Sequence, residues 1–241
     1  RMGTMKLRSS VMNEEMISSA ELSRAACCNL GESFVTNPSV DVSYSDAATG
    51  AKQIKLLGLS GTYVQMLTEN IPNYRGAASP YGLGYVPGPW MQSIQVSKGI
   101  SSVKNGYEAI TGQINVEFKK PQLLEADWVS ANLFASSTNR YEANADATLK
   151  LSKRWSTSLL AHYENETKAH DGNDDGFVDI PQVEQYNVWN RWAYMGDHYV
   201  FQAGFKALSE SRTSGQAHHT DMQTGDLYKV GIDTERYEFF T

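Results

Sequence analysis

Long apolar runs are missing from this 241-residue sequence, in which no stretch approaches the ~18 consecutive hydrophobic residues that indicate a membrane helix. The composition therefore excludes membrane-spanning helices. It does not exclude a transmembrane β-barrel, whose strands alternate apolar and polar side chains and keep the mean hydropathy low. With 41% hydrophobic residues, the chain has enough apolar side chains for one large or two ordinary folded domains.

Cysteine is scarce, and the two that are present, Cys27 and Cys28, are adjacent. Adjacent cysteines can pair only through a strained ring, so a structural disulfide is not expected. No cysteine, histidine or methionine stands nearby at metal-ligand spacing. Two buried small residues on a helix are the simplest interpretation, and a thiol pair for a soft metal is the alternative.

Clusters of basic residues are also missing, and the formal net charge is −6, so nucleic acid is not an expected partner. The sequence has no secretory segment and starts abruptly at Arg1, which we interpret as a processed or partial product and not as a sign of the cytoplasm. It contains no nucleophile and base pair, zinc spacing, phosphate-binding loop or carboxylate dyad. These absences argue against catalysis, and we expect no enzymatic activity.

The first third of the chain predicts a small α+β domain. Ser18 and Glu21 have capping-box spacing, and the helical recurrence of apolar residues from Leu22 to Phe34 predicts a helix that ends at Pro38. Three β-rich runs follow, at residues 39–44, 52–59 and 63–67.

Residues 93–121 are the segment around which we expect this domain to be organised. Two β-branched runs bracket a stretch that contains Gly99, Gly106 and Gly112, which predicts a strand, a loop set by glycine, and a second strand. Glycine at such positions supplies a positive φ or permits close backbone approach. The preceding residues 73–90 mix aromatic residues with proline and glycine, which predicts an irregular loop with an exposed aromatic surface. In the alternative, these aromatic side chains pack inward against a barrel wall.

The second half of the chain has an apolar period of two. From Tyr141 to Ser152 apolar and polar residues alternate without exception, and the runs at residues 129–135 and 199–207 repeat the pattern. This alternation is long for a soluble strand and matches the length that crosses a bilayer on a tilt. A soluble β-sandwich whose sheets each have one solvent-exposed face is the alternative. In the membrane interpretation, Ala145 and Ala147 face lipid, whereas Asp146 and Thr148 face the interior.

The connections between these runs predict an orientation. Short connections at residues 153–154 and 196–197 are typical of periplasmic turns, and longer ones at residues 167–185 and 209–227 are typical of extracellular loops. About six strands fit between residues 126 and 241, too few to close a barrel, and lipid does not tolerate an open edge. We therefore expect the front part of a longer protein, or a barrel that another polypeptide completes. Aromatic residues stand near the ends of the runs, where membrane girdles place them: Trp128, Trp155, Trp192, Tyr194 and Tyr199.

These features resemble the TonB-dependent outer-membrane receptors, whose plug domain ends in the pattern V.KG..S...G...I.G.IN before the barrel begins. Nine residues fall on that pattern: Val96, Lys98, Gly99, Ser102, Gly106, Ile110, Gly112, Ile114 and Asn115. The family's initial helix, its NP.V strand and its segment ending in RG at Arg75 and Gly76 also have counterparts, so residues 17–121 resemble nearly a whole plug. The resemblance implies a plug domain at residues 1–125 and, at residues 126–241, the first strands of an antiparallel barrel of about 22 strands.

The resemblance implies active uptake of a scarce nutrient across the bacterial outer membrane, with energy from a TonB-type periplasmic protein. A metal chelate such as a ferric siderophore or haem is the favoured ligand. The other expected partners are membrane lipid and the remaining barrel strands or other outer-membrane proteins. One alternative is a receptor-like barrel with a structural or interaction role in an outer-membrane assembly, and another is a soluble calcium-binding β-sandwich. The resemblance places the following residues at the plug apex, where the ligand binds: Tyr63, Gln65, Arg75, Tyr81 and Tyr85.

One acidic stretch has the spacing of a metal site. Oxygen side chains at relative positions 1, 3, 5 and 9, with Gly176 at position 6, reproduce the first nine positions of a calcium loop. Position 12 holds Gln182 instead of a bidentate glutamate, so we expect weak binding. A solvated acidic turn without metal is the alternative, and no other cofactor is expected. The predicted ligands are Asp171, Asn173, Asp175, the carbonyl of Phe177, and Asp179.

Overall fold

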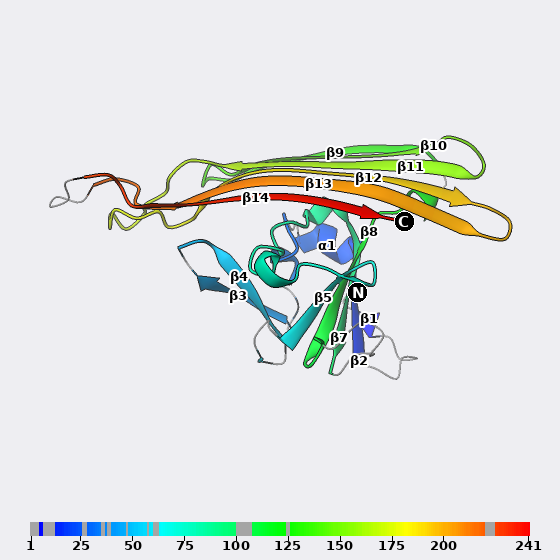
Figure 1. Cartoon of the computed structure of the whole chain (residues 1–241), viewed down its shortest axis with the longest axis horizontal. Coiled ribbons are helices and arrows are strands. Elements are labelled where there is room, and N and C mark those ends of the chain that lie inside the picture. The colour runs from blue at the N-terminus through cyan, green and yellow to red at the C-terminus, as the bar shows by residue number, and fades with distance from the viewer. Residues whose placement is uncertain are drawn as a thin grey trace. The chain divides into compact units, whose positions relative to one another are not determined.

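The computed structural model describes residues 5–6, 13–25, 28–34, 37, 40–46, 48–56, 58–59, 63–99, 108–123, 126–219 and 225–241. The chain divides into two compact units (Figure 1): Arg1–Asp46 with Ala51–Lys119, and Ala47–Gly50 with Lys120–Thr241. The division after Lys119 lies a few residues before the position expected at residue 125. Among the described residues, no helix is long and apolar enough to cross a membrane.

The first unit is built on a six-stranded sheet in the order β1-β2-β7-β8-β5-β6. The pairs are antiparallel except for β5 and β8, which run parallel. The central strands β7 and β8 carry fully buried apolar side chains on neighbouring positions, which form the core of this unit. The strands are β1 (Met5–Lys6), β2 (Asn13–Ser18), β5 (Val64–Thr68), β6 (Ile71–Pro72), β7 (Met91–Lys98) and β8 (Gly112–Phe118).

The prediction of one long helix is wrong, because α1 (Ser19–Ala25) is short and the described residues between it and Pro38 contain only the 3₁₀ turn η1 (Glu32–Phe34). Asn29, four residues after the end of α1, instead forms an isolated β-bridge with Pro87. Next to it, the Leu30 amide donates to the Val86 carbonyl at 3.0 Å. These partners lie far along the chain, so the local apolar period could not indicate them.

The aromatic loop before β7 is also more buried than expected. Tyr74, Tyr85 and Trp90 are each at most 3% exposed. Trp90 packs edge-on against Phe118 of β8 at 6.4 Å between ring centroids, so these rings fill the core of the first unit and do not form an exposed aromatic surface. This region contains the 3₁₀ helices η3 (Gly76–Ala78) and η4 (Gly88–Trp90), and a separate hairpin of β3 (Val40–Asp46) and β4 (Ala51–Leu56) completes the unit.

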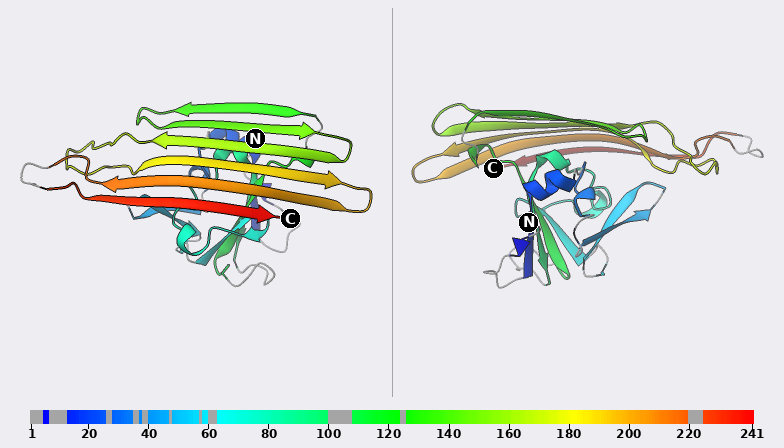
Figure 2. Two further views of the ribbon diagram at one scale, coloured as in Figure 1. Left: turned by 45° about the horizontal axis from the view of Figure 1, so that its top comes forward. Right: turned by 180° about the vertical axis from the view of Figure 1, so that it is seen from behind.

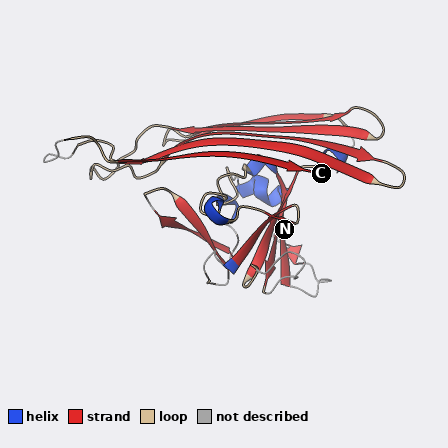
Figure 3. Cartoon of the chain, in the orientation of Figure 1, coloured by secondary structure: helices blue, strands red, loops and turns tan. Residues whose placement is uncertain are grey.

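The second unit is an antiparallel meander in which each strand pairs with the next along the chain, as the left view of Figure 2 shows. Figure 3 shows that strands dominate this part of the chain, where the 3₁₀ turn η6 (Pro121–Leu123) precedes the sheet. The described strands are β9 (Trp128–Ala135), β10 (Tyr141–Lys150), β11 (Trp155–Glu166), β12 (Gln182–Met195), β13 (Val200–Gly215) and β14 (Lys229–Phe240).

The alternation predicted for this unit is confirmed. In β10, Ala145 is exposed, whereas Asp146 is 6% exposed and accepts a hydrogen bond from the Ser130 hydroxyl at 2.8 Å. The sheet therefore has an apolar exposed face and a polar buried face, the reverse of a sheet in water. Aromatic pairs stand on the exposed face near both strand ends: Trp155 with Tyr194 at 5.0 Å, and Tyr163 with Tyr186 at 4.9 Å.

Candidate functional site

The first unit contains a cavity of about 610 Å³, which we call the Arg75 cavity. It lies between the β3–β4 hairpin, strand β5, the turn that contains η3, and the residues just before β8. A volume of several hundred cubic ångströms is typical of sites for small molecules. Its polar lining consists of Ser45, Lys52, Gln53, Asn73, Arg75, Ser79 and Glu108, and its apolar lining includes Ile54, Val64, Met66 and Leu83.

An ion pair joins two sides of the Arg75 cavity. Arg75 donates from Nη2 and Nε to the same carboxylate oxygen, Oε1 of Glu108, at 2.6 and 3.0 Å. The two residues are 33 positions apart in the sequence. The pair is in contact with solvent, because the Arg75 side chain is 52% exposed and the Glu108 side chain 29% exposed.

The residues predicted at the apex differ in exposure. Arg75 lines the cavity, and Tyr63, which directly precedes β5, is 43% exposed. Gln65 and Tyr85 are only 2% and 1% exposed, so their contact with a ligand stays a prediction. Tyr85 instead packs against the Tyr74 ring at 6.3 Å between centroids. Tyr81 is half-buried and does not line the cavity.

Sequence reasoning missed Lys52, Asn73 and Glu108 as cavity residues. They come from three separate segments that only the tertiary structure brings together. The one available signal was Glu108, a carboxylate within the glycine-rich segment that resembles the plug pattern.

Gly99 and Gly112 of the glycine-rich segment differ in the space around them. Gly112, the first residue of β8, has a φ of +153°, and a Cβ there would lie 2.1 Å from the Ser97 carbonyl oxygen. Gly99 has a φ of +91° but faces open space. Gly99 and Gly112 therefore both have the expected positive φ. Only Gly112 of the two also shows the expected close approach of another backbone segment. Gly106 lies outside the described residues.

In the acidic loop, carboxylates hold the backbone turn. Asp171 accepts hydrogen bonds from the amides of Asp175 at 3.2 Å and Gly176 at 2.8 Å, and Asp179 accepts one from the Gly172 amide at 2.7 Å. Asp175 accepts one from the amide of Phe177 at 2.8 Å. Nowhere in the described part of the chain do three or more His, Cys, Asp or Glu residues form a group that could hold a metal ion.

Asn173 uses its amide to donate to Asp175 at 3.0 Å, so this predicted ligand also takes part in the turn. The oxygens proposed as calcium ligands are thus engaged with N–H groups, as turn-forming Asp and Asn commonly are. Calcium binding stays a prediction.

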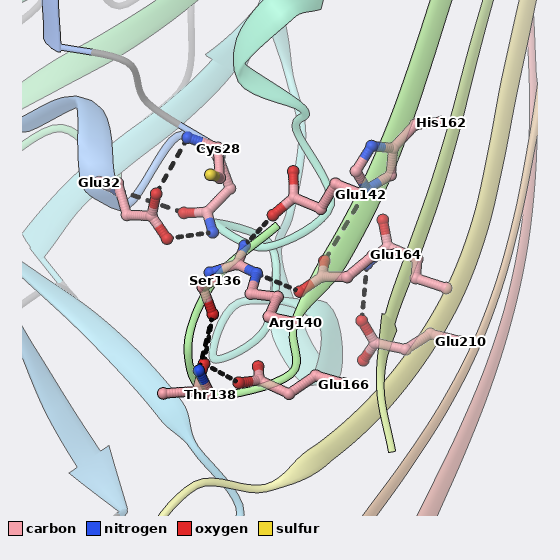
Figure 4. A network of polar contacts seen from close by, with 12 residues as sticks. Cys28, Glu32, Ser136, Thr138, Arg140, Glu142, His162, Glu164, Glu166 and Glu210 are labelled. Atoms are coloured by element: carbon pink, nitrogen blue, oxygen red, sulfur yellow. Dashed lines mark hydrogen bonds and ion pairs between the residues drawn. The ribbon is translucent and has the colours of Figure 1, made fainter. Parts of the chain in front are cut away.

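The buried face of the second unit carries a network of charges (Figure 4). Arg140 contacts Glu142 at 2.6 Å and Glu164 at 3.0 Å. His162 Nδ1 lies 2.8 Å from the Asn144 side-chain oxygen. These buried charges are paired within the sheet, as burial of charge requires. We therefore assign the network to the structure of the sheet.

Comparison with known proteins identifies the first unit. The family described as the TonB-dependent Receptor Plug Domain matches residues 6–113. No curated protein sequence is significantly similar to this chain.

Solved structures share the fold of both units. The pyoverdine outer-membrane receptor FpvA from Pseudomonas aeruginosa PAO1, bound to pyoverdine, is 15% identical with a TM-score of 0.70, over 87% of this chain and 29% of FpvA. The ferric-catecholate import receptor Fiu from E. coli K12 is 18% identical with a TM-score of 0.64, over 87% of this chain and 28% of Fiu. The ferric yersiniabactin uptake receptor FyuA from Yersinia pestis is 16% identical with a TM-score of 0.61, over 88% of this chain and 33% of FyuA.

The chain thus spans about a third or less of the length of these receptors. The matched plug residues, the fold shared with the solved receptors and the apolar exposed face of the second sheet agree with one another. Residues 6–113 of this chain match the TonB-dependent receptor plug domain, and the antiparallel strands that follow share the fold of the outer-membrane receptors to which the chain is similar.

Proposed function

We propose that this chain is part of a receptor that imports a scarce nutrient across the outer membrane, and that the nutrient is a metal chelate such as a ferric siderophore or haem. The Arg75 cavity is the observation that carries the proposal. A plug that only filled a barrel would need no cavity of about 610 Å³ with charged and apolar lining. The solved receptors with this fold include proteins whose names refer to pyoverdine, ferric yersiniabactin and ferric catecholates, which supports a metal chelate as ligand.

Import against a gradient needs energy, and we propose that a TonB-type periplasmic protein delivers it. The plug domain of the first unit supports this partner, because the matching family is defined by dependence on TonB. The lipid of the outer membrane would cover the apolar face of the second unit, where Leu133, Val129 and Phe239 are each at least 73% exposed. Further barrel strands would pair with the edge strands β9 and β14.

The alternative, a receptor-like barrel with a structural role in an outer-membrane assembly, predicts a filled apex. The cavity beside Arg75 favours import over that role.

Growth on defined iron sources tests the proposal. A strain without other iron-chelate receptors would express the full-length receptor that carries this chain, with and without TonB, and receive one chelate at a time as its iron source. We expect growth on at least one chelate, and only when both the receptor and TonB are present. Growth that never depends on the receptor, combined with a leaky outer membrane after its deletion, would contradict import and support the structural role.

A further inference from the structure

We propose that Arg75 selects the ligand of the Arg75 cavity by binding a carboxylate of an amphipathic metal chelate, and that Glu108 is the resident group which this carboxylate displaces. The inference rests on the proposed function, because it takes the cavity as the place that receives the imported ligand. It adds the chemical class of that ligand and the residue that recognises it.

The charge of the cavity lining favours an anion. Two cationic side chains, Lys52 and Arg75, and one carboxylate, Glu108, line the cavity. The lining therefore carries a formal charge of +1 with the ion pair closed, and +2 when Glu108 has moved away. A positive concave surface raises the local concentration of anionic ligands and gives neutral ones no such advantage.

The geometry of Arg75 points to a carboxylate. Its Nη2 and Nε both donate to one oxygen of Glu108, so the guanidinium is already oriented to bind a carboxylate. The planar guanidinium fork matches planar oxyanions, and a ligand carboxylate can take the place of the Glu108 carboxylate with the same hydrogen bonds.

The backbone at Arg75 leads into a defined turn. Arg75 is extended, with φ −101° and ψ 162°, and directly precedes the 3₁₀ turn η3. Gly76 has a φ of +59°, and the amide of Ser79 closes the turn by donating to the Gly76 carbonyl at 3.1 Å. The recognition residue thus stands on a defined turn rather than on an extended loop, which limits the conformational entropy lost on binding.

The Arg75–Glu108 ion pair is exposed to solvent, which allows a ligand to displace Glu108. Ion pairs in contact with solvent contribute little to stability, so exchange of one carboxylate for another costs little. The Lys98–Glu15 pair between β7 and β2 is different, because its side chains are only 13% and 7% exposed at a similar distance of 2.7 Å. We therefore assign the Lys98–Glu15 pair to folding and the Arg75–Glu108 pair to recognition.

The apolar part of the cavity lining determines which kind of ligand fits beside the charged residues. Ile54, Val64, Met66 and Leu83 give the cavity an apolar wall beside the charged residues. A chelate with an apolar body and carboxylates at one edge complements this arrangement. Haem has this form, and haem dimethyl ester keeps the body but lacks free carboxylates, so the two compounds make a matched pair of probes.

The test uses the full-length receptor that carries this chain, purified from outer membranes and titrated with haem or haem dimethyl ester while tryptophan fluorescence reports binding. We expect the wild type to bind haem about tenfold or more tightly than the ester, and Arg75→Gln to lose this preference. Glu108→Gln should raise the affinity for haem by about two- to fivefold, because the resident competitor is weakened. A misfolded variant cannot produce such a gain.

Arg154→Gln is the matched control. Arg154 forms an ion pair with Asp197 in the second unit, at the same 2.6 Å as the Arg75–Glu108 pair, and its side chain has the same 52% exposure. This variant should leave both affinities unchanged.

Equal affinity of the wild type for haem and its ester would overturn the proposal, and so would an unchanged haem affinity in Arg75→Gln. No binding of haem at all would overturn the proposed ligand class. None of these results affects import itself, which fails only if growth on every chelate is independent of the receptor and TonB.

Discussion

At the scale of single residues, the plug domain depends on positions that tolerate no substituent. Gly112 begins β8 between two other strands, and its missing side chain lets the Ser97 carbonyl of β7 approach. Next to it, the Thr111 amide and hydroxyl both donate to the Tyr63 carbonyl, at 3.1 and 3.0 Å. The chain just after Glu108 is thereby fixed to the start of β5, which sets where Glu108 meets Arg75.

A substitution at Gly112 should disrupt this junction. Gly112→Ala places a Cβ against backbone and adds strain at positive φ, so we expect a loss of about 1–3 kcal/mol in the stability of the plug sheet. Gly99→Ala has the positive φ without the clash, and should cost only about 1 kcal/mol. Hydrogen exchange of the β7 and β8 amides in the purified receptor measures both changes. Equal protection in the two variants would show that the close approach to Ser97 has no energetic role.

At the scale of the secondary-structure elements, the strands of the second unit are defined by which face meets lipid. The exposed face of β10 to β13 is largely apolar between the aromatic pairs near the strand ends, where the polar side chains of Thr157 and Asn190 donate to backbone carbonyls. Beyond Tyr163 and Tyr186 it becomes polar, at Asn165 and Glu184. Aromatic residues of this kind mark the membrane interfaces. Depth in the bilayer should therefore control the cost of a charge on this face.

Ala145→Arg tests the assignment of this face. Ala145 lies in the middle of β10 on the exposed face, so we expect the substitution to cost about 2–4 kcal/mol when the receptor folds into a bilayer. Asn165→Arg, on the same face of β11 beyond the aromatic pair, should cost about 0–1 kcal/mol. Equilibrium folding into lipid vesicles gives both values. A similar cost at the two positions would contradict the membrane assignment of the sheet.

The loop between β11 and β12 is held by Asp171. Asp171→Ala removes the acceptor for two amides, so we expect the exchange of the Asp175 and Gly176 amides to quicken by an amount corresponding to about 1–2 kcal/mol. Hydrogen exchange with and without calcium measures this effect, with Asp197→Ala in the turn after β12 as the control.

The two interpretations of the loop predict different calcium responses. If the carboxylates serve only the turn, calcium should leave the wild-type loop unchanged. Protection of the loop by calcium at about 10⁻⁴–10⁻³ M, lost in Asp175→Ala, would instead establish the calcium site that the spacing of the loop suggests.

At the scale of the whole molecule, the parts that local chemistry determines could be predicted from the sequence. The alternation around Ala145 and Asp146 predicted the strands of the second unit and which side chains face outward. The glycine pattern predicted the close backbone approach at Gly112. The early end of α1 at Ala25 could not be predicted, because Asn29 and Leu30 are bound by partners more than fifty residues away.

The Arg75 cavity could not be predicted from the sequence for a similar reason. Its lining combines residues of β5, of the separate β3–β4 hairpin and of the segment before β8, and no local pattern encodes how these segments come together. Arg75 was predicted at the ligand site through family resemblance, whereas its partner Glu108 follows only from the fold.

A structure of the full-length receptor with a chelate that supports growth tests the central claim most directly. We expect density for the chelate in the Arg75 cavity, with an oxygen of the ligand within hydrogen-bonding distance of the Arg75 guanidinium and with Glu108 displaced. A chelate bound elsewhere, with the Arg75–Glu108 pair intact and the cavity empty, would contradict it.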